Sequence, residues 1–179
     1  THHHHPTTNT NTSGAHARVG HITYLKQMEK RTMARVDYME KQRHINFAMR
    51  FILVDWLVEV QDVYQLNVQT LFIAVNYIDR FLSTMSVETS KLQLVGVAAL
   101  MLAAKYEEIW PPSICMFSYI TANSYTQEQI LQMEHVMLRA LRFDMGAVTA
   151  YSYHDEVTKG YDGVMRALCL YVIELSLLD

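Results

Sequence analysis

The sequence has few side chains at spacings that support catalysis. It contains no glycine-rich phosphate loop, no Cys-x-x-Cys pair, no His-Glu-x-x-His helix and no serine in a nucleophile elbow. Beyond residue 20 the histidines occur singly, at His21, His44, His135 and His154. Glu107 and Glu108 are adjacent, but neighbouring helical residues point about 100° apart. We therefore expect a protein that is not an enzyme, with no catalytic residue, no cofactor and no metal site.

The segment 46–64 carries the chemistry of a binding surface instead. One apolar stripe at helical spacing consists of Met49, Ile52, Leu53, Trp56 and Val60. A second consists of Phe47, Phe51, Val54 and Val58. A surface helix needs one stripe, so this helix is either buried all round, which periodicity alone favours, or exposes an apolar groove. Glu59 flanks the first stripe, and an acid beside an aromatic groove suits a peptide with Arg or Lys and an apolar anchor.

Four charged residues interrupt apolar runs. Lys105 follows thirteen uncharged residues, 92–104, so its stem is expected to lie along apolar surface. Its ammonium group either reaches water or is held by an acid, for which Glu134 is the candidate, because an unpaired buried charge is costly. Arg50 and Asp79 pose the same question, and for them we favour a structural pair.

Helices must position these residues. Helical patterns and stop signals predict helices over 21–33, 46–64, 67–85, 90–107, 112–120, 126–142, 149–158 and 162–178. Asn67 is a plausible N-cap, and the segment beginning at Thr126 is close to a capping box. The segment 92–104 is too short to span a membrane and rich in small residues. It is therefore expected to be the central helix of the domain.

Composition sets the outer limits. The chain has 179 residues, of which 50% are apolar and 18% charged, with 6 glycines and 3 prolines. These values disfavour disorder and turn-rich β folds. The formal net charge of −3 offers no basic surface for nucleic acid or a membrane, so we expect neither partner. Two cysteines suit a reducing compartment. Residues 1–20 are expected to be a disordered, His-rich polar tail, either a tag or low-complexity sequence.

Several long motifs in register resemble the cyclin box. They are MRFILVDWLVEV at 49–60, NYIDRFL at 76–82, KLQLVG at 91–96 and AAKYEEIWPP at 103–112. FLSTMSV at 81–87, MEH at 133–135 and FDM at 143–145 look most like an A-type mitotic cyclin, with B-type cyclins as the close alternative. The resemblance implies an all-α fold, with a five-helix box around the central helix. It implies an N-terminal helix and linker at 21–45, the box at 46–145, and the start of an incomplete second box at 146–179.

The resemblance also implies a function. A cyclin is a non-catalytic regulatory subunit that binds and activates a cyclin-dependent protein kinase, recruits substrates and inhibitors bearing Arg-x-Leu motifs, and controls the cell cycle from the nucleus and cytoplasm. The implied kinase-binding residues are Lys105, Glu134, Leu102, Tyr106, Glu107, Glu108, Ile109, Leu138, Phe143, Met145 and Tyr24. The implied docking groove consists of Met49, Ile52, Leu53, Trp56, Glu59, Leu92 and Gln93. Arg50 and Asp79 match the family's internal salt bridge.

Some positions depart from the family pattern. Phe51 replaces a small residue, His21 an apolar one and Val148 a proline, while Val63 and Ala122 replace acids that often enrich the groove. In the implied second box, the apolar stripe Val164, Leu168, Tyr171, Val172 and Leu175 would lack most of its partners. A truncated cyclin that binds partners but activates kinase poorly is therefore an alternative. A DNA-contacting transcription factor with the same fold and a helical enzyme or apolar-ligand receptor fit less well, because the basic face and the catalytic motifs are missing.

Overall fold

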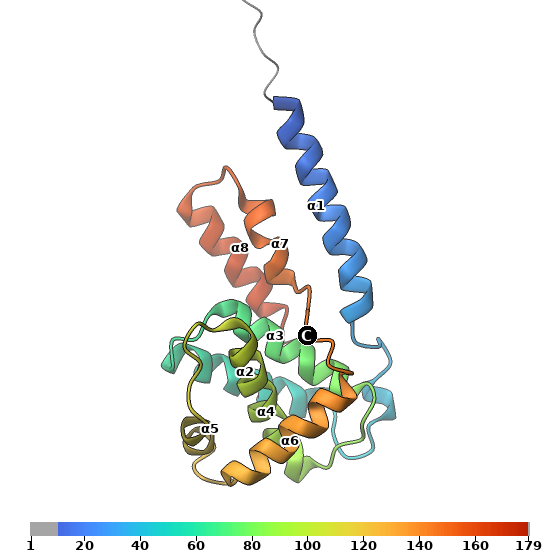
Figure 1. The fold of residues 1–179 in the computed structure, drawn as a ribbon, viewed down its shortest axis with the longest axis vertical. Coiled ribbons are helices and arrows are strands. Elements are labelled where there is room, and N and C mark those ends of the chain that lie inside the picture. Colours follow the sequence, from blue (N-terminus) through green and yellow to red (C-terminus); the bar gives the residue numbers. More distant parts are fainter. Residues whose placement is uncertain (1–10, 179) are drawn as a thin grey trace, which may run out of the picture.

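The computed structural model describes residues 11–178, which form α-helices, two short 3-10 helices and no strand (Figure 1). The all-α prediction is confirmed. In chain order the elements are α1 (Asn11–Thr32), η1 (Met39–Lys41), α2 (Phe47–Val63), α3 (Val68–Leu82), η2 (Thr89–Lys91), α4 (Leu92–Glu107), α5 (Ile114–Ile120), α6 (Gln127–Ala140), α7 (Ala150–Thr158) and α8 (Gly163–Leu175). Within these residues, no helix combines the length and the apolar character that crossing a membrane requires.

Helix α4 is the centre of the domain. It packs against α2, α3, α5 and α6, and nearly all of its residues from Leu92 to Ala104 are buried. Its small residues let the neighbours come close: a Cβ added to Gly96 would lie 2.6 Å from Leu53 Cδ1 of α2. This arrangement is the expected five-helix box, α2 to α6, around an apolar helix.

The expected helix starts are explained by side-chain caps. Asn67 Oδ1 accepts a hydrogen bond from the backbone N–H of Gln69 at 2.9 Å and begins α3. Thr126 and Gln129 form a reciprocal capping box at the start of α6. Each cap satisfies backbone N–H groups that have no partner inside the helix. The caps fix where the helices that carry Asp79 and Glu134 begin.

Helix α1 begins earlier than the sequence pattern predicts. It starts at Asn11 rather than near His21, so residues 11–20, expected to be disordered, are helical. The C-terminal half of α1 is anchored by buried Leu25 and Thr32 and packs on α7. Once such a turn exists, each added residue gains one backbone hydrogen bond, so the helix extends through polar sequence. The part of the predicted tail at 1–10 lies outside the described residues.

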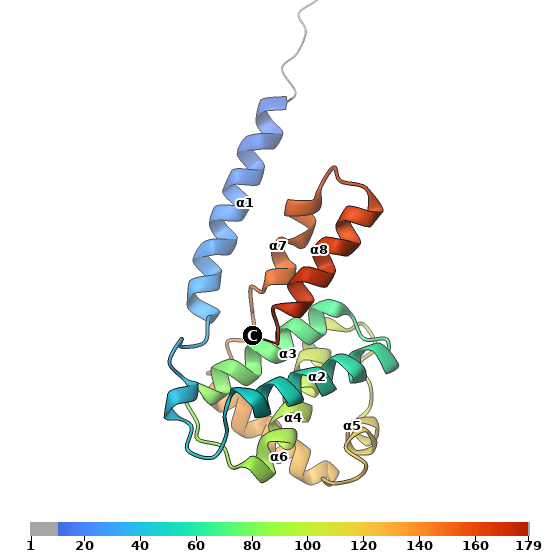
Figure 2. The same cartoon turned by 180° about the vertical axis from the view of Figure 1, so that it is seen from behind.

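Helices α7 and α8 pair beside α3 and the C-terminal half of α1 (Figure 2). No residue of α8 is buried, and the exposed apolar stripe is the one expected to lack partners: Val164, Leu168, Tyr171, Val172 and Leu175. After α8, the chain returns to the box, where Leu177 is buried. The box thus holds the end of this segment while the outer face of α8 stays open.

Candidate functional site

An ion pair links the central helix to α6. Lys105 Nζ donates to both oxygens of Glu134, at 2.7 and 2.9 Å. The Glu134 side chain is 8% exposed and the Lys105 side chain 47% exposed. The Lys105 side chain is therefore half-exposed and held by Glu134. Of the two charged groups, the ammonium group is the one that faces solvent.

Apolar side chains of α4, α6 and the following segment accompany this ion pair. Tyr106 and Phe143 are exposed, Leu138 and Met145 are half-buried, and Leu102 is buried. The segment after α6 is fixed by two hydrogen bonds from α3: Tyr77 Oη donates to the carbonyl of Met145 at 2.7 Å, and Arg80 Nη2 donates to that of Asp144 at 2.9 Å. We call the surface formed by Lys105, Tyr106, Glu134, Leu138, Phe143 and Met145 the α4–α6 face.

The remaining predicted kinase-binding residues lie differently. Glu108 turns toward the start of α3, where its Oε1 accepts from the backbone N–H of Asn67 at 2.7 Å and from Thr70 Oγ1 at 2.5 Å. This structural role was missed, because nothing in the local sequence pairs residue 108 with the cap at 67. Burial and the neighbouring Glu108 raise the pKa of Glu107. Ile109 is highly exposed beyond α4. Tyr24 is exposed on α1, whose principal helix neighbour is α7.

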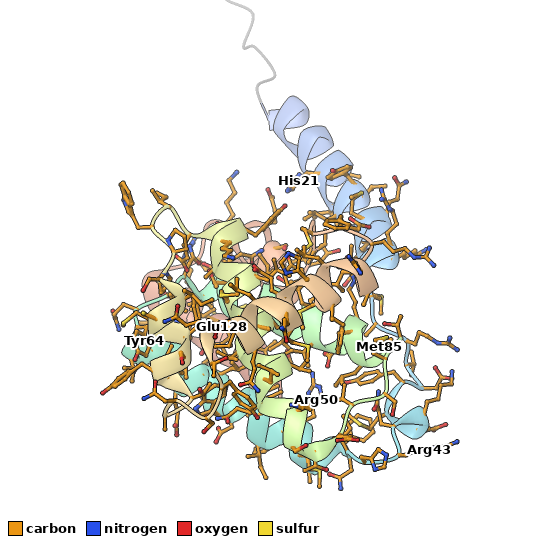
Figure 3. All side chains as sticks on the ribbon, turned by 60° about the horizontal axis from the view of Figure 1, so that its bottom comes forward. His21, Arg43, Arg50, Tyr64, Met85 and Glu128 are labelled. Carbon is orange, nitrogen blue, oxygen red and sulfur yellow. The ribbon has the colours of Figure 1, made fainter. Side chains whose placement is uncertain are left out.

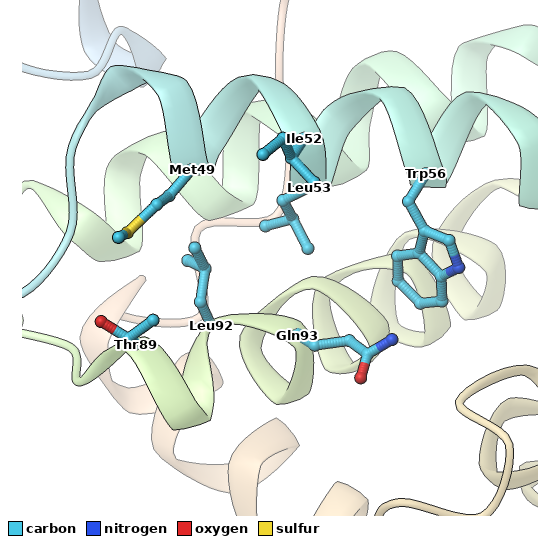
Figure 4. A pocket seen from close by; sticks show the side chains of 7 residues that line it. All are labelled: Met49, Ile52, Leu53, Trp56, Thr89, Leu92 and Gln93. Carbon is cyan, nitrogen blue, oxygen red and sulfur yellow. The ribbon is translucent and has the colours of Figure 1, made fainter.

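An apolar groove lies between α2 and the start of α4 (Figure 4). Its volume is about 390 Å³, and it is lined by Met49, Ile52, Leu53, Trp56, Thr89, Leu92 and Gln93. Periodicity alone favours a helix that is buried all round. The structure differs, because the Ile52 side chain on α2 is 67% exposed. Thr89 is the lining residue that sequence reasoning missed, because it precedes the apolar run of α4. We call this surface the docking groove.

Glu59 lies in the next hollow along α2, a space of about 520 Å³ that shares Trp56 with the docking groove. The rest of its lining is largely apolar or aromatic and consists of Val60, Val63, Tyr64, Tyr119, Ile120, Ala122 and Asn123. Among these residues Glu59 supplies the carboxylate. An acid thus stands beside an aromatic groove, the arrangement that suits a peptide with a basic residue and an apolar anchor.

Arg50, labelled in Figure 3, forms an ion pair with Asp79, and the side chains are 7% and 17% exposed. Arg50 Nε and Nη2 donate to the two oxygens of Asp79, each at 2.8 Å. Tyr38 Oη also donates to Asp79, at 2.7 Å, and Arg50 Nη1 donates to the carbonyl of Leu177 at 3.0 Å. Burial alone would lower the pKa of Arg50, but the hydrogen bonds and charge of Asp79 outweigh it and raise that pKa. The network is structural and joins α2, α3 and the chain after α8.

Across residues 11–178, no group of three or more His, Cys, Asp or Glu side chains is placed to hold a metal ion. The surfaces described above present apolar side chains and a few charges, which is the composition of sites that bind protein segments.

Comparison with known proteins identifies this architecture. Residues 21–146 match the family described as cyclin, N-terminal domain. The chain is 49% identical to Cyclin-A2 of Homo sapiens over 163 residues, covering 88% of this chain and 37% of the relative. It is 48% identical to the G2/mitotic-specific cyclin-A of Spisula solidissima over 158 residues, covering 87% and 37%. The chain thus spans less than two fifths of the length of these relatives.

A solved structure with the same fold is that of a viral cyclin from herpesvirus saimiri. The TM-score is 0.79 with 21% sequence identity, over 88% of this chain and 71% of that one. At this identity the likeness concerns the fold alone. It agrees with the helical box that the sequence led us to expect. With the matched family covering most of the chain and the similarity to A-type cyclins covering nearly all of it, the chain belongs to the cyclin family.

Proposed function

We propose that the chain is the part of a cyclin that binds and activates a cyclin-dependent protein kinase through the α4–α6 face. The observation that carries this proposal is the Lys105–Glu134 pair, in which a buried carboxylate holds a half-exposed ammonium group among apolar side chains. In the free chain the ammonium group is only half covered, so the pair has charged surface left for a partner to bury. Its placement beside exposed Tyr106 and Phe143 suits a partner that buries it.

The pair retains hydrogen-bonding capacity for such a partner. An ammonium group has three donors, and Lys105 uses two on Glu134, whose oxygens keep further lone pairs. Together they can hold the backbone at one end of the kinase's mobile helix, while the apolar side chains fix its rotation. A cyclin that binds the active arrangement of that helix more tightly shifts the kinase toward it, without doing chemistry itself.

Kinase pull-down combined with a histone-kinase assay tests this proposal. We expect the chain to retain a cyclin-dependent kinase and to raise its activity toward histone.

The outer face of α8 favours a second candidate, a cyclin piece that binds the kinase without activating it, because the apolar stripe of α8 is exposed. Retention without activation would support that candidate, and no retention would contradict both.

We also propose that the docking groove recruits substrates and inhibitors bearing Arg-x-Leu motifs. The leucine would enter the space between Met49, Leu53 and Trp56, and the arginine would lie toward Glu59. Val63 and Ala122 supply no charge in the hollow around Glu59. The attraction for the basic residue is therefore expected to be modest.

Removing the walls of the docking groove should abolish Arg-x-Leu binding. In a Met49→Ala/Trp56→Ala variant, we expect the affinity for an Arg-x-Leu peptide to fall by about 100-fold, because buried anchor contacts each contribute roughly 1–2 kcal/mol or more. Fluorescence anisotropy with a labelled peptide measures the change. Phe47→Ala/Phe51→Ala is the matched control, since both side chains are exposed on α2 without lining the groove. Equal peptide affinity in the groove variant would place the docking site elsewhere.

A further inference from the structure

Arginine side chains gather in a hollow that borders the α4–α6 face and shares Phe143 with it. The proposed function assigns no role to these arginines. The hollow lies where the C-terminal ends of α1 and α6 come together, next to the last turn of α3 (Figure 1). Its volume is about 590 Å³. Among the described residues that line it are four arginines and one carboxylate: Arg31, Arg35, Arg80, Arg142 and Asp144. We call this hollow the arginine cleft.

The guanidinium groups of the arginine cleft are incompletely paired. Arg31 Nη2 lies 3.6 Å from Asp144 Oδ2, beyond hydrogen-bond distance, and Arg35 Nε lies 3.4 Å from Asp37, which Lys41 also contacts at 2.9 Å. Several N–H donors of these side chains are therefore free for a ligand.

The other two arginines lack a carboxylate partner within the part of the chain that the structure describes. Arg80 donates to the carbonyl of Asp144 at 2.9 Å and to the amide oxygen of Asn76 at 3.4 Å. Arg142 is exposed and forms no ion pair there. Four cations against one lining carboxylate leave a local charge of about +3 in a chain whose formal charge is −3.

This arrangement has an electrostatic cost in the free protein. Arg80 is half-buried, and the loss of water around it lowers its pKa, although Asp144 acts in the opposite direction. An arginine stays protonated under these conditions, so the positive charge remains and is poorly solvated. An anion with several oxygens would relieve the mutual repulsion and occupy the free donors.

We propose that the arginine cleft binds a phosphorylated serine or threonine on a peptide segment of a partner protein. A phosphate monoester brings close to two negative charges and three acceptor oxygens, which match this surplus better than a single carboxylate does. Met33 and Phe143 line the same hollow with 59% and 68% of their surface exposed. These apolar side chains suit the residues that flank a phosphate in a peptide and favour a peptide over a nucleic-acid backbone.

Anisotropy with two labelled peptides tests this proposal. The first contains a single phosphothreonine between two leucines, and the second is the same peptide without phosphate. We expect the full chain to bind the phosphorylated peptide at least tenfold more tightly, with an affinity that falls as salt is added. In an Arg31→Glu/Arg142→Glu variant, we expect this preference to disappear. Both side chains are exposed, so the variant should fold, which its thermal unfolding temperature checks.

The charge-matched control is Lys91→Glu/Lys159→Glu, which changes two exposed lysines outside the arginine cleft. The control should keep the preference for phosphate, so a uniform loss in both variants would show attraction to net charge and overturn the proposal. Equal binding of the phosphorylated and plain peptides would also overturn it, as would equal binding of a peptide with glutamate in place of phosphothreonine. If a single-stranded oligonucleotide bound more tightly than the phosphorylated peptide, the ligand of the arginine cleft would be a nucleic acid, and the proposal would be wrong.

Discussion

Alanine in place of Lys105 is expected to weaken binding to a cyclin-dependent kinase by about 2–5 kcal/mol, the usual cost of removing one partner of a charge pair that an interface buries. The reason lies in the unequal burial of the pair. Glu134 is nearly buried already, and a bound kinase would cover what remains. Without Lys105, a carboxylate is left in the interface with no cation. Titration calorimetry with the purified kinase measures the change in Kd.

Glu134→Ala should have a comparable effect on kinase binding and a different effect on the free chain. Its loss leaves Lys105 able to reach water, because that side chain is half-exposed. The loss of Lys105, by contrast, strands a nearly buried carboxylate. We therefore expect Lys105→Ala to lower the thermal unfolding temperature more than Glu134→Ala does.

The matched control for this pair is Lys91→Ala, at an exposed lysine just before the same helix. It should change neither the affinity for the kinase nor the unfolding temperature by a measurable amount. An unchanged Kd for Lys105→Ala would remove the pair from the kinase-binding surface.

The helical pattern predicts most of the helices and the central one among them, because the features that define them are local, whereas the five-helix box was implied by the resemblance to cyclins. The apolar run 92–104 is too short to span a membrane and is predicted to be the central helix, which the structure confirms. The caps at Asn67 and Thr126 follow from residue type. The length of α1 was not readable, because its first turns are polar and depend on an anchor at Leu25 and Thr32. Contacts far along the chain decide such an element, and single-sequence patterns do not contain them.

The candidate sites also divide into residues that the local sequence predicts and residues that only contacts between distant segments bring together. Lys105 and Glu134 stood out because charges inside apolar runs demand a partner. The open groove on α2 did not follow from periodicity, since two apolar stripes are compatible with full burial as well. The sequence pattern predicts neither the capping role of Glu108 nor the arginine cleft, for a further reason. They unite residues 38 or more positions apart, from segments that look ordinary in isolation.

The largest loss of stability is expected from Arg50→Ala. The substitution removes both hydrogen bonds to Asp79 and the one to the Leu177 carbonyl. It leaves a largely buried carboxylate with Tyr38 as its remaining side-chain partner. Breaking a buried pair in this way costs about 3–5 kcal/mol. Urea unfolding followed by circular dichroism measures the difference.

Two further variants separate charge from geometry. Arg50→Lys keeps the charge but not the planar, two-pronged contact, so an intermediate loss is expected. In Arg50→Ala/Asp79→Ala neither charge is stranded, so the combined loss should be smaller than the sum of the single losses. Additive losses would mean that the pair does not act as a unit. Because Arg50 also holds the Leu177 carbonyl, hydrogen exchange at the end of α8 should accelerate in Arg50→Ala more than in Asp79→Ala, which keeps the arginine that holds this segment on the box.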